Sequence, residues 1–243
     1  MVSNHLNHHK VYQSCCSYNC HYCHSPVIKF GKVGSKQRYR CKMCGKTQLH
    51  QYVKRAYRAS TNSYIALYVK EDCGIRTISR LLSISANTVI KRIKNIADNI
   101  TKPAISINRI YELDELKTYV KNKTKECWVA YALDKQTGQV VDFKVGRRNK
   151  SNLKMVADTL LLSGCKQIYT DKLEIYRRLI PAKMHITRRF GINKIERKNL
   201  TLRTHLKRLN RKTICYSKSA AMLEACLKIY FWHRSCPKFI AYN

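Results

Sequence analysis

Acidic residues are scarce in this chain, and the few that exist are unevenly placed. The 243 residues include 14 Asp and Glu against 48 Lys and Arg, which gives a formal net charge of +34 at pH 7. No acidic residue precedes Glu71, and Glu196 is the only one between Glu174 and Glu224. A solvated surface does not need such an excess of cations. We therefore expect a polyanionic partner, and double-stranded DNA fits best.

Long apolar runs, glycine and proline are also scarce. No run reaches the roughly 20 apolar residues that span a bilayer, and the first ten residues lack the apolar core of a signal peptide. The basic amphipathic helix or lipidation motif expected of a protein that binds an anionic membrane is missing too. We therefore expect an intracellular protein with no membrane partner. With 8 Gly and 4 Pro, ordered elements should extend through most of the chain.

Cysteine, by contrast, is abundant, and in a reducing compartment the 12 cysteines are expected to be metal ligands and small buried side chains. Two Cys-x2-Cys pairs flank a segment, 27–40, that has the pattern of strand, turn and strand. This spacing predicts a ribbon over residues 15–55 with one structural Zn²⁺. The alternative, four free thiols, gives no packing reason for the paired spacing. The predicted ligands are Cys20, Cys23, Cys41 and Cys44. The identity of the ligands on the side of the first pair stays open, because other potential ligands lie near it: Cys15, Cys16, His21 and His24.

Residues 56–100 have helical periodicity. An apolar segment at 64–69 is followed by helical patterns at 74–82 and 87–96, with a break at 83–85, which is the layout of a helix-turn-helix. In the last segment Val89, Ile93 and Ile96 recur at helical spacing, and Ser85 is placed to cap the helix. An ordinary helical hairpin with a solvated basic face is the alternative. The residues expected to face a major groove are Asn87, Lys91, Arg92, Lys94 and Asn95.

Residues 101–104 are predicted to link the helices to an α/β domain over residues 105–243. Strand patterns occur at 109–120, 126–134, 139–145, 166–171 and 183–187, and helical patterns at 151–162, 173–179 and from 193 onward. Three sequential strands, a crossover helix and then alternating elements predict a mixed sheet flanked by helices.

Three carboxylates are the candidate metal ligands of this domain. Asp114 lies within one predicted strand, Asp171 closes another, and Glu196 follows on a helix after twenty-four intervening residues. Hard cations such as Mg²⁺ prefer carboxylate oxygens, and two such ions can clamp the attacking and leaving oxygens of a phosphodiester. Glu112 shares a strand face with Asp114 and is its rival, whereas Glu115 is expected to point to the other face.

The helix that contains Glu196 allows a second explanation of this residue. A carboxylate on an exposed helix often forms only an ion pair with a cation one turn away. The helical pattern, however, places Glu196, Asn199 and Arg203 in a line beside the apolar stripe, with the carboxylate over the edge of the sheet. The stripe itself consists of Ile195, Leu202, Leu206 and Leu209.

Several of these motifs resemble the transposases of the insertion-sequence-one family. They are Tyr169-Thr-Asp171, the basic segment 195–219, Asp114-Glu-Leu with the following Tyr119-Val, and the segments 36–47 and 87–95. The resemblance covers most of the chain. It implies a zinc-binding and helix-turn-helix part joined to a ribonuclease-H-like catalytic domain. It also implies a catalytic triad of Asp114, Asp171 and Glu196, with Arg203 at a basic position two turns later. The chain departs from the family at Lys117, where Trp is common, and at Lys172-Leu173, where Gly-Trp is common.

Residues and resemblance together predict a DNA transposase. It would bind the terminal inverted repeats of its element, cleave the ends with two Mg²⁺ or Mn²⁺ ions, and join the 3′ ends to target DNA. We expect a homo-oligomer on DNA, located in the bacterial cytoplasm with the nucleoid. A non-catalytic zinc and helix-turn-helix repressor and a stand-alone nuclease are the alternatives. Residues 1–14, with the cluster 5–9 that is rich in histidine, are predicted to form a disordered tail. The predicted phosphate contacts of the catalytic domain are Arg203, Lys207, Arg208 and Arg211.

Overall fold

The computed structural model describes residues 18–49, 58, 60–188 and 191–233. The chain divides into two compact units, Met1–Lys54 and Arg55–Asn243. This division lies one residue from the predicted boundary between the zinc ribbon and the helices. The predicted tail over residues 1–14, and with it Cys15 and Cys16, lies outside the described residues.

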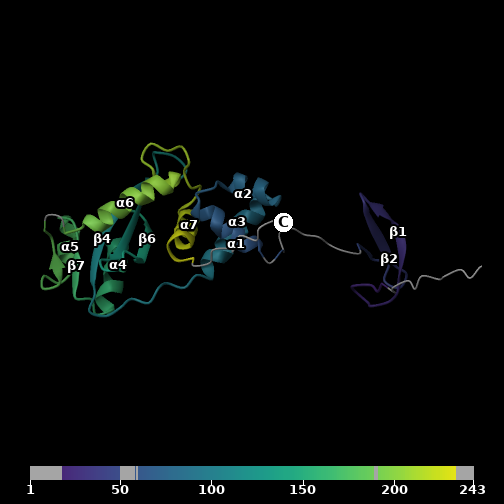
Figure 1. Ribbon diagram of the computed structural model, residues 1–243, viewed down its shortest axis with the longest axis horizontal. Coiled ribbons are helices and arrows are strands. Elements are labelled where there is room, and N and C mark those ends of the chain that lie inside the picture. Colours follow the sequence, from purple (N-terminus) through teal and green to yellow (C-terminus); the bar gives the residue numbers. More distant parts are fainter. Residues whose placement is uncertain (1–17, 50–57, 59, 189–190, 234–243) are drawn as a thin grey trace, which may run out of the picture. The chain divides into compact units, whose positions relative to one another are not determined.

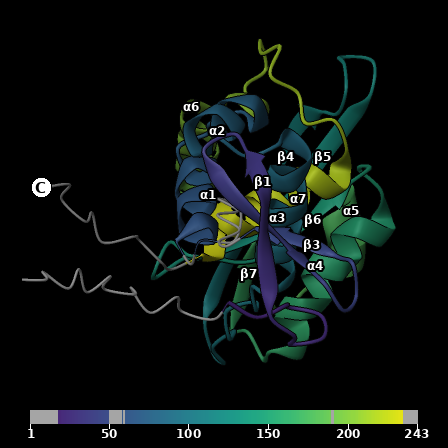
Figure 2. The ribbon, with the colours of Figure 1, turned by 90° about the vertical axis from the view of Figure 1, so that its right-hand side faces the viewer.

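The first unit contains a three-stranded antiparallel sheet. Strands β1 (Val27–Val33) and β2 (Lys36–Cys41) form the predicted hairpin, and β3 (Thr47–Leu49), which was not predicted, pairs with β2 (Figure 2). The turn between β1 and β2 contains Gly34 with a φ of 59°, a conformation that favours glycine. Only three described side chains of this unit are buried: Cys20, Cys41 and Gln48. Such a small sheet needs another source of stability than a hydrophobic core.

The second unit begins with three helices, α1 (Thr61–Lys70), α2 (Ile75–Leu82) and α3 (Ala86–Asp98). The turn between α2 and α3 contains Ser83 in the left-handed region, with a φ of 51°. The hydroxyl of Ser85 accepts a hydrogen bond of 3.1 Å from the backbone N–H of Thr88, so the predicted cap of α3 is present. The predicted apolar stripe of α3 is also buried: Val89, Ile93 and Ile96.

A five-stranded mixed sheet follows, in the order β6-β5-β4-β7-β8. Strands β4 (Ile110–Tyr119), β5 (Glu126–Asp134) and β6 (Val140–Gly146) form an antiparallel meander. Strand β7 (Gln167–Tyr169) pairs parallel with β4, and β8 (His185–Ile186) pairs parallel with β7. This is the predicted ribonuclease-H-like sheet. Because β7 is shorter than predicted, Asp171 lies two residues beyond the strand instead of closing it.

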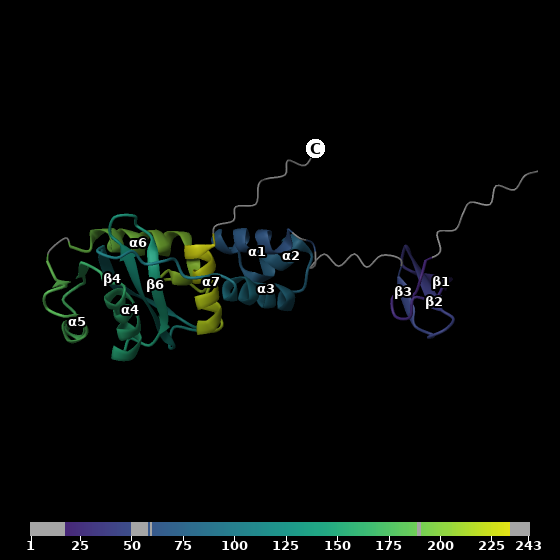
Figure 3. The ribbon, with the colours of Figure 1, turned by 90° about the horizontal axis from the view of Figure 1, so that it is seen from below.

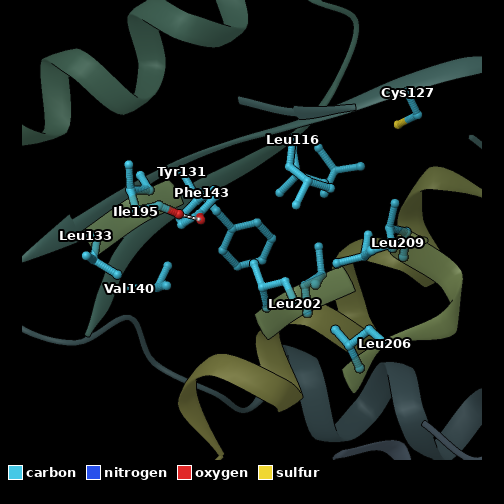
Figure 4. Packing of buried hydrophobic residues seen from close by; sticks show 14 residues of the cluster. Leu116, Cys127, Tyr131, Leu133, Val140, Phe143, Ile195, Leu202, Leu206 and Leu209 are labelled. Carbon is cyan, nitrogen blue, oxygen red and sulfur yellow. Dashed lines mark hydrogen bonds between the residues drawn. The ribbon is translucent and has the colours of Figure 1, made fainter. Parts of the chain in front are cut away.

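Helices cover both faces of the sheet (Figures 1 and 3). Helices α4 (Lys150–Leu162) and α5 (Glu174–Leu179) pack on one face, and α6 (Asn193–His205) and α7 (Ala220–Trp232) pack on the other. Helix α6 is shorter than predicted, because the chain leaves the helix at Leu206 and forms a 3-10 turn, η2 (Lys207–Leu209). Leu206 and Leu209 nevertheless stay buried with Ile195 and Leu202, as Figure 4 shows.

Helix α7 connects the three N-terminal helices to the sheet. It lies between them and the sheet in Figures 1 and 3. Its side chains Met222, Cys226 and Ile229 pack in one hydrophobic cluster with α1, α2 and α3, while Leu223 and Leu227 pack in the cluster on the sheet. The domains predicted at 56–100 and 105–243 therefore lie side by side within one compact unit, Arg55–Asn243, and contact each other through α7. No helix was predicted at the position of α7, so this connection is a finding of the structure.

Two ion pairs reinforce the connection between the helices and the sheet. Within the predicted linker, Lys102 Nζ lies 2.6 Å from the buried Asp142 carboxylate of β6. In the loop after α1, the carboxylate of Asp72 accepts hydrogen bonds from Arg208 Nε (3.1 Å) and from the backbone N–H of Lys207 (2.6 Å). Among the described residues, no helix is both long and apolar enough to cross a membrane.

The pair of Asp72 and Arg208 gives a stability prediction. The Asp72 and Arg208 side chains are 7% and 11% exposed, and removal of one charge from a pair this buried leaves the other uncompensated. We expect Asp72→Asn to lower the free energy of unfolding by about 3–5 kcal/mol in urea denaturation of the full chain. Asn tolerates the left-handed backbone at position 72 as well as Asp does, so backbone strain should not contribute.

The matched control is Glu174→Gln, because Glu174 pairs with Arg177 and Arg178 at the surface, where all three side chains are at least 60% exposed. Loss of an exposed pair should cost no more than about 1 kcal/mol. Equal losses of stability in the two variants would show that the Asp72 pair does not hold the helices to the sheet.

Candidate metal centres

Three carboxylates gather at the edge of β4. Ligand atoms of Asp114, Glu115 and Asp171 lie within 4.8 Å of one another. The sheet explains why residues so far apart in sequence meet. β7 runs parallel to β4, with Tyr169 opposite Glu112, so the loop after β7 continues along the edge of β4 to the level of Asp114. Two of the three predicted metal ligands are therefore neighbours.

Asp114 is held from two directions. Its Oδ1 accepts a hydrogen bond of 2.8 Å from the backbone N–H of Glu115, and its Oδ2 accepts one of 2.7 Å from the Asn199 amide of α6. The Asn199 amide oxygen in turn accepts a hydrogen bond of 2.8 Å from the hydroxyl of Tyr131 on β5. Burial of the carboxylate, aided by the nearby charges of Glu115 and Asp171, raises the pKa of Asp114 to about 6. A cation bound here would relieve that unfavourable environment.

Asp171 has a simpler environment. Its Oδ1 accepts a hydrogen bond of 3.0 Å from the backbone N–H of Leu173, which fixes the turn after β7. The neighbouring Thr170 hydroxyl contacts His185 Nε2 of β8 at 2.7 Å. The other carboxylate oxygen of Asp171 makes no hydrogen bond or ion pair with any residue that the structure describes. Asp171 therefore offers a free oxygen beside Asp114.

Glu115 belongs to the carboxylate group although it was not predicted as a metal ligand. It lies on the opposite strand face from Asp114, as expected, but its carboxylate still reaches the same group because both residues lie at the open edge of the sheet. The carboxylate accepts a hydrogen bond of 2.6 Å from the hydroxyl of Tyr176 and pairs with Arg148 at 3.1 Å. Burial raises the pKa of Tyr176, and the charge of the Glu115 carboxylate raises it further. Glu115 therefore connects the carboxylate group to Tyr176 and Arg148.

Glu112, the predicted rival of Asp114, has a structural role that the sequence did not reveal. Its side chain is fully buried and accepts a hydrogen bond of 2.7 Å from the backbone N–H of Ile195 in the first turn of α6. It also pairs with Lys135 Nζ at 3.1 Å. Because α6 has no side-chain cap from its own N-terminal residue, Glu112 supplies one from the sheet. The contact fixes the start of the helix that contains Glu196.

Glu196 does not belong to the group of carboxylates within 4.8 Å. It is exposed on α6, one turn before Asn199, which contacts Asp114. The alternative explanation required an ion pair along the helix, but the Glu196 carboxylate makes no ion pair or hydrogen bond within the described part of the chain. Glu196 as the third ligand therefore stays a prediction.

The donor set at the sheet edge fits a hard divalent cation. Mg²⁺ binds oxygen at ~2.1 Å, so oxygens that share one ion lie up to ~4.2 Å apart, close to the spacing of this group. Each carboxylate oxygen can accept more than one contact, so the hydrogen bonds to Asp114 leave room for a cation.

The four predicted zinc ligands also converge. The Sγ atoms of Cys20 and Cys44 are 3.5 Å apart, as are those of Cys23 and Cys41. Four sulfurs at ~2.3 Å from a tetrahedral Zn²⁺ would be ~3.8 Å apart, so the cluster fits this ion. His21 and His24, which the sequence left open, are not in the cluster. The Nε2 of His21 instead contacts the hydroxyl of Tyr18 at 3.0 Å.

The residues predicted to bind DNA differ in their exposure. Arg208 is a correction, because its guanidinium is nearly buried and is already engaged with the Asp72 carboxylate and the Cys226 sulfur. Arg203 is half-buried and donates to the backbone carbonyl of Leu209 at 3.0 Å. Arg92 is also half-buried, on α3. The remaining predicted contacts are exposed: Asn87, Lys91, Lys94, Asn95, Lys207 and Arg211.

Comparison with known proteins decides the family. Residues 108–235 match the profile of the family described as IS1 transposase. The chain belongs to this family. It is 36% identical over 115 residues to the insertion element iso-IS1n protein InsB of Shigella dysenteriae, which covers 47% of this chain and 88% of that protein. It is 32% identical over 119 residues to the IS1 4 protein InsB of Escherichia coli K12, which covers 49% of this chain and 71% of that protein. Family membership makes this chain a DNA transposase.

A solved structure of the HTLV-2 integrase catalytic core domain in complex with magnesium is also similar. It is 16% identical, covers 53% of this chain and 86% of that chain, and has a TM-score of 0.34. The family match begins at residue 108, so the zinc ribbon and the helices α1 to α3 are assigned from their own sequence and geometry.

Proposed function

We propose that this IS1-family transposase binds the terminal inverted repeats of its element, cleaves the DNA at the ends, and joins the freed 3′ ends to target DNA. The observation that carries the proposal is the meeting of Asp114 and Asp171 at the open edge of β4, with a carboxylate oxygen of Asp171 left free. Two partly buried carboxylates side by side favour a cation between them, and the surface of a chain with a net charge of +34 favours polyphosphate.

The residues of the site divide into ligands and supports. Asp114 and Asp171 would hold two Mg²⁺ or Mn²⁺ ions, and Glu196 would complete the second ion's ligands by turning inward from α6. Bound there, the ions would lower the pKa of the attacking water or 3′-hydroxyl and stabilise the leaving oxygen. Asn199 and Tyr131 orient Asp114 through consecutive hydrogen bonds. Glu112 positions α6. Because the pKa of Asp114 is raised, a proton on its carboxylate must leave before Asp114 can bind a metal ion.

Two regions of the second unit would bind DNA: helix α3 and the basic surface near the carboxylates. The exposed polar residues of α3 would enter the major groove, while Arg203, Lys207 and Arg211 would contact phosphates near the carboxylates. Because both ends of an element must be processed together, we expect at least two copies of the chain on DNA. We place this activity in the bacterial cytoplasm, at the nucleoid.

The test is a comparison of two reactions on labelled DNA that contains the element end. The proposal expects nicking of the end in Mg²⁺ and joining of a pre-cut 3′ end to a second duplex. A protein that binds the end but does neither is a repressor. A protein that nicks but never joins is a stand-alone nuclease. Either result would contradict the proposed reaction.

The assignment of end recognition to α3 gives a further prediction. Phosphate contacts position a protein while base contacts specify the site, so Lys91→Ala should either flatten the preference for element ends or reduce the salt slope of binding by ~0.9. Binding titrations against end and random duplexes at several salt concentrations measure both quantities. Lys154→Ala is the control, because Lys154 lies on α4 and is already paired with Asp158. If Lys91→Ala discriminates ends as well as Lys154→Ala and with the same salt slope, Lys91 does not contribute to end recognition.

A further inference from the structure

A small cavity opens beside the carboxylates, along the second half of β4. β7 pairs with β4 only from Ile110 to Glu112, so the rest of this edge has no neighbouring strand in the part of the chain that the structure describes. The cavity has a volume of about 240 Å³. It is smaller than the ~300–1,000 Å³ of sites for drug-sized ligands, which suits a single ring system. Its lining consists of Glu115, Lys117, Tyr119, Trp128, Arg203 and Arg211.

One side of the cavity is aromatic. Trp128 on β5 stands opposite Lys117 on β4, and its partly exposed ring lines the cavity together with Tyr119. The guanidinium of Arg148 lies 4.7 Å from the centroid of the Trp128 ring and also pairs with Glu115, which fixes the ring beside the metal-binding residues. Partly exposed aromatic rings in a basic groove are platforms on which nucleobases stack.

The other side of the cavity has unneutralised positive charge. Lys117 pairs with Glu126, and Arg148 pairs with Glu115. Arg203 and Arg211, in contrast, have no carboxylate partner among the described residues. Burial, together with the charge of Arg211, lowers the pKa of Arg203. Two neighbouring guanidinium groups without a counter-ion favour an anion, and their planar donors match a phosphate.

We propose that this cavity holds one unpaired nucleotide of the DNA strand that is cut or joined, with its base against Trp128 and Tyr119 and its phosphate on Arg203 and Arg211. The inference rests on the proposed function and adds a substrate subsite to it. Because Glu115 lines the cavity and also belongs to the carboxylate group, the nucleotide would lie next to the phosphate that reacts. A base inside a duplex cannot enter, so the strand must be locally unpaired.

The test compares two single strands of equal length and charge, an eight-nucleotide oligo(dT) and its fully abasic counterpart, each bound to the full chain. Stacking of one base adds about 5- to 150-fold in affinity, so the parent should bind oligo(dT) at least about fivefold more tightly. Trp128→Ala should abolish this preference, and Arg211→Ala should weaken binding of both strands equally. Equal affinities of the parent for both strands would overturn the inference, and so would a preference that persists in a folded Trp128→Ala protein.

Tryptophan fluorescence keeps the test decisive if Trp128→Ala fails to fold. The chain has two tryptophans, and the indole N–H of Trp232 is engaged with the backbone carbonyl of Val140 at 2.7 Å. Oligo(dT) should therefore quench Trp128 in the parent. Trp128→Phe should keep the preference for bases but lose the quenching. Undiminished quenching in Trp128→Phe would place the base elsewhere.

Failure of the subsite and failure of the proposed function give different results. If the parent nicks and joins element ends in Mg²⁺ but does not prefer bases over abasic strands, only the subsite is wrong. If the parent prefers bases through Trp128 but never cuts DNA, the proposed reaction is wrong while the cavity still binds a nucleotide.

Discussion

Asp114→Asn is expected to abolish Mg²⁺-dependent cleavage and joining while the protein still folds and binds DNA. The amide keeps the shape and the hydrogen bond from the Glu115 backbone, but it loses the charge that holds a hard cation. We expect a loss of at least about 1,000-fold, beyond the ~10- to 100-fold that is typical when only a residue supporting a metal ligand is removed. Cleavage and strand-transfer rates on a labelled element end measure the loss, and Asp171→Asn should behave in the same way.

The sign of the effect on DNA binding adds a second criterion. Removal of a carboxylate from so basic a protein should leave nonspecific DNA affinity equal or slightly higher. The structure leaves Glu174→Gln as the matched control, because Glu174 is exposed on α5, whereas Glu112 caps α6 and Glu115 holds Tyr176 and Arg148. If Asp114→Asn lost DNA binding in parallel with activity, its effect would be on folding and not on metal binding.

Cys41→Ser is expected to remove the structural zinc and unfold the ribbon. Only three described side chains of this unit are buried, two of them predicted zinc ligands, so the unit has almost no core to replace the metal. Zinc binding in small modules supplies apparent free energies of roughly 10–16 kcal/mol, which becomes the folding energy of the module. Metal analysis of a fragment covering residues 1–55 should give one Zn²⁺ per chain, and the variant fragment should give none.

Cys215→Ser in the full chain is the control for the zinc prediction, because Cys215 is an exposed cysteine outside the ribbon. It should leave the zinc content unchanged, whereas Cys41→Ser in the full chain should lower it by one ion. A fragment of residues 1–55 without near-stoichiometric zinc would contradict the assignment of the ribbon.

Features set by local spacing could be predicted from the sequence. The repeat of Val89, Ile93 and Ile96 identified the buried face of α3, and Ser85 caps that helix because its position relative to the stripe is fixed by helical geometry. The cluster of four sulfurs could be predicted because the paired spacing of the cysteines is also a local feature of the sequence. The order of the strand and helix patterns was sufficient to predict the mixed sheet.

Features set by contacts between distant residues could not be predicted. In the sequence nothing distinguishes Arg208 from the other cations of its basic segment. Its burial could not be predicted, because its partner Asp72 lies 136 residues away. The cap that Glu112 supplies to α6 spans 83 residues. The alternation of a strand correctly placed Glu115 on the opposite face from Asp114. It could not reveal that β7 ends early enough for the Glu115 carboxylate to reach the same edge of the sheet.

The most direct test of the account is the strand-transfer rate of purified Glu196→Gln on a labelled, pre-cut element end in Mg²⁺. Glu196 is exposed on α6 and has no described partner, so this substitution should disturb neither folding nor packing. If Glu196 completes the metal site, the variant should bind the end as well as the parent does and join none of it. A variant that joins ends at a rate comparable to the parent would remove Glu196 from the site and contradict the Asp-Asp-Glu mechanism proposed for this chain.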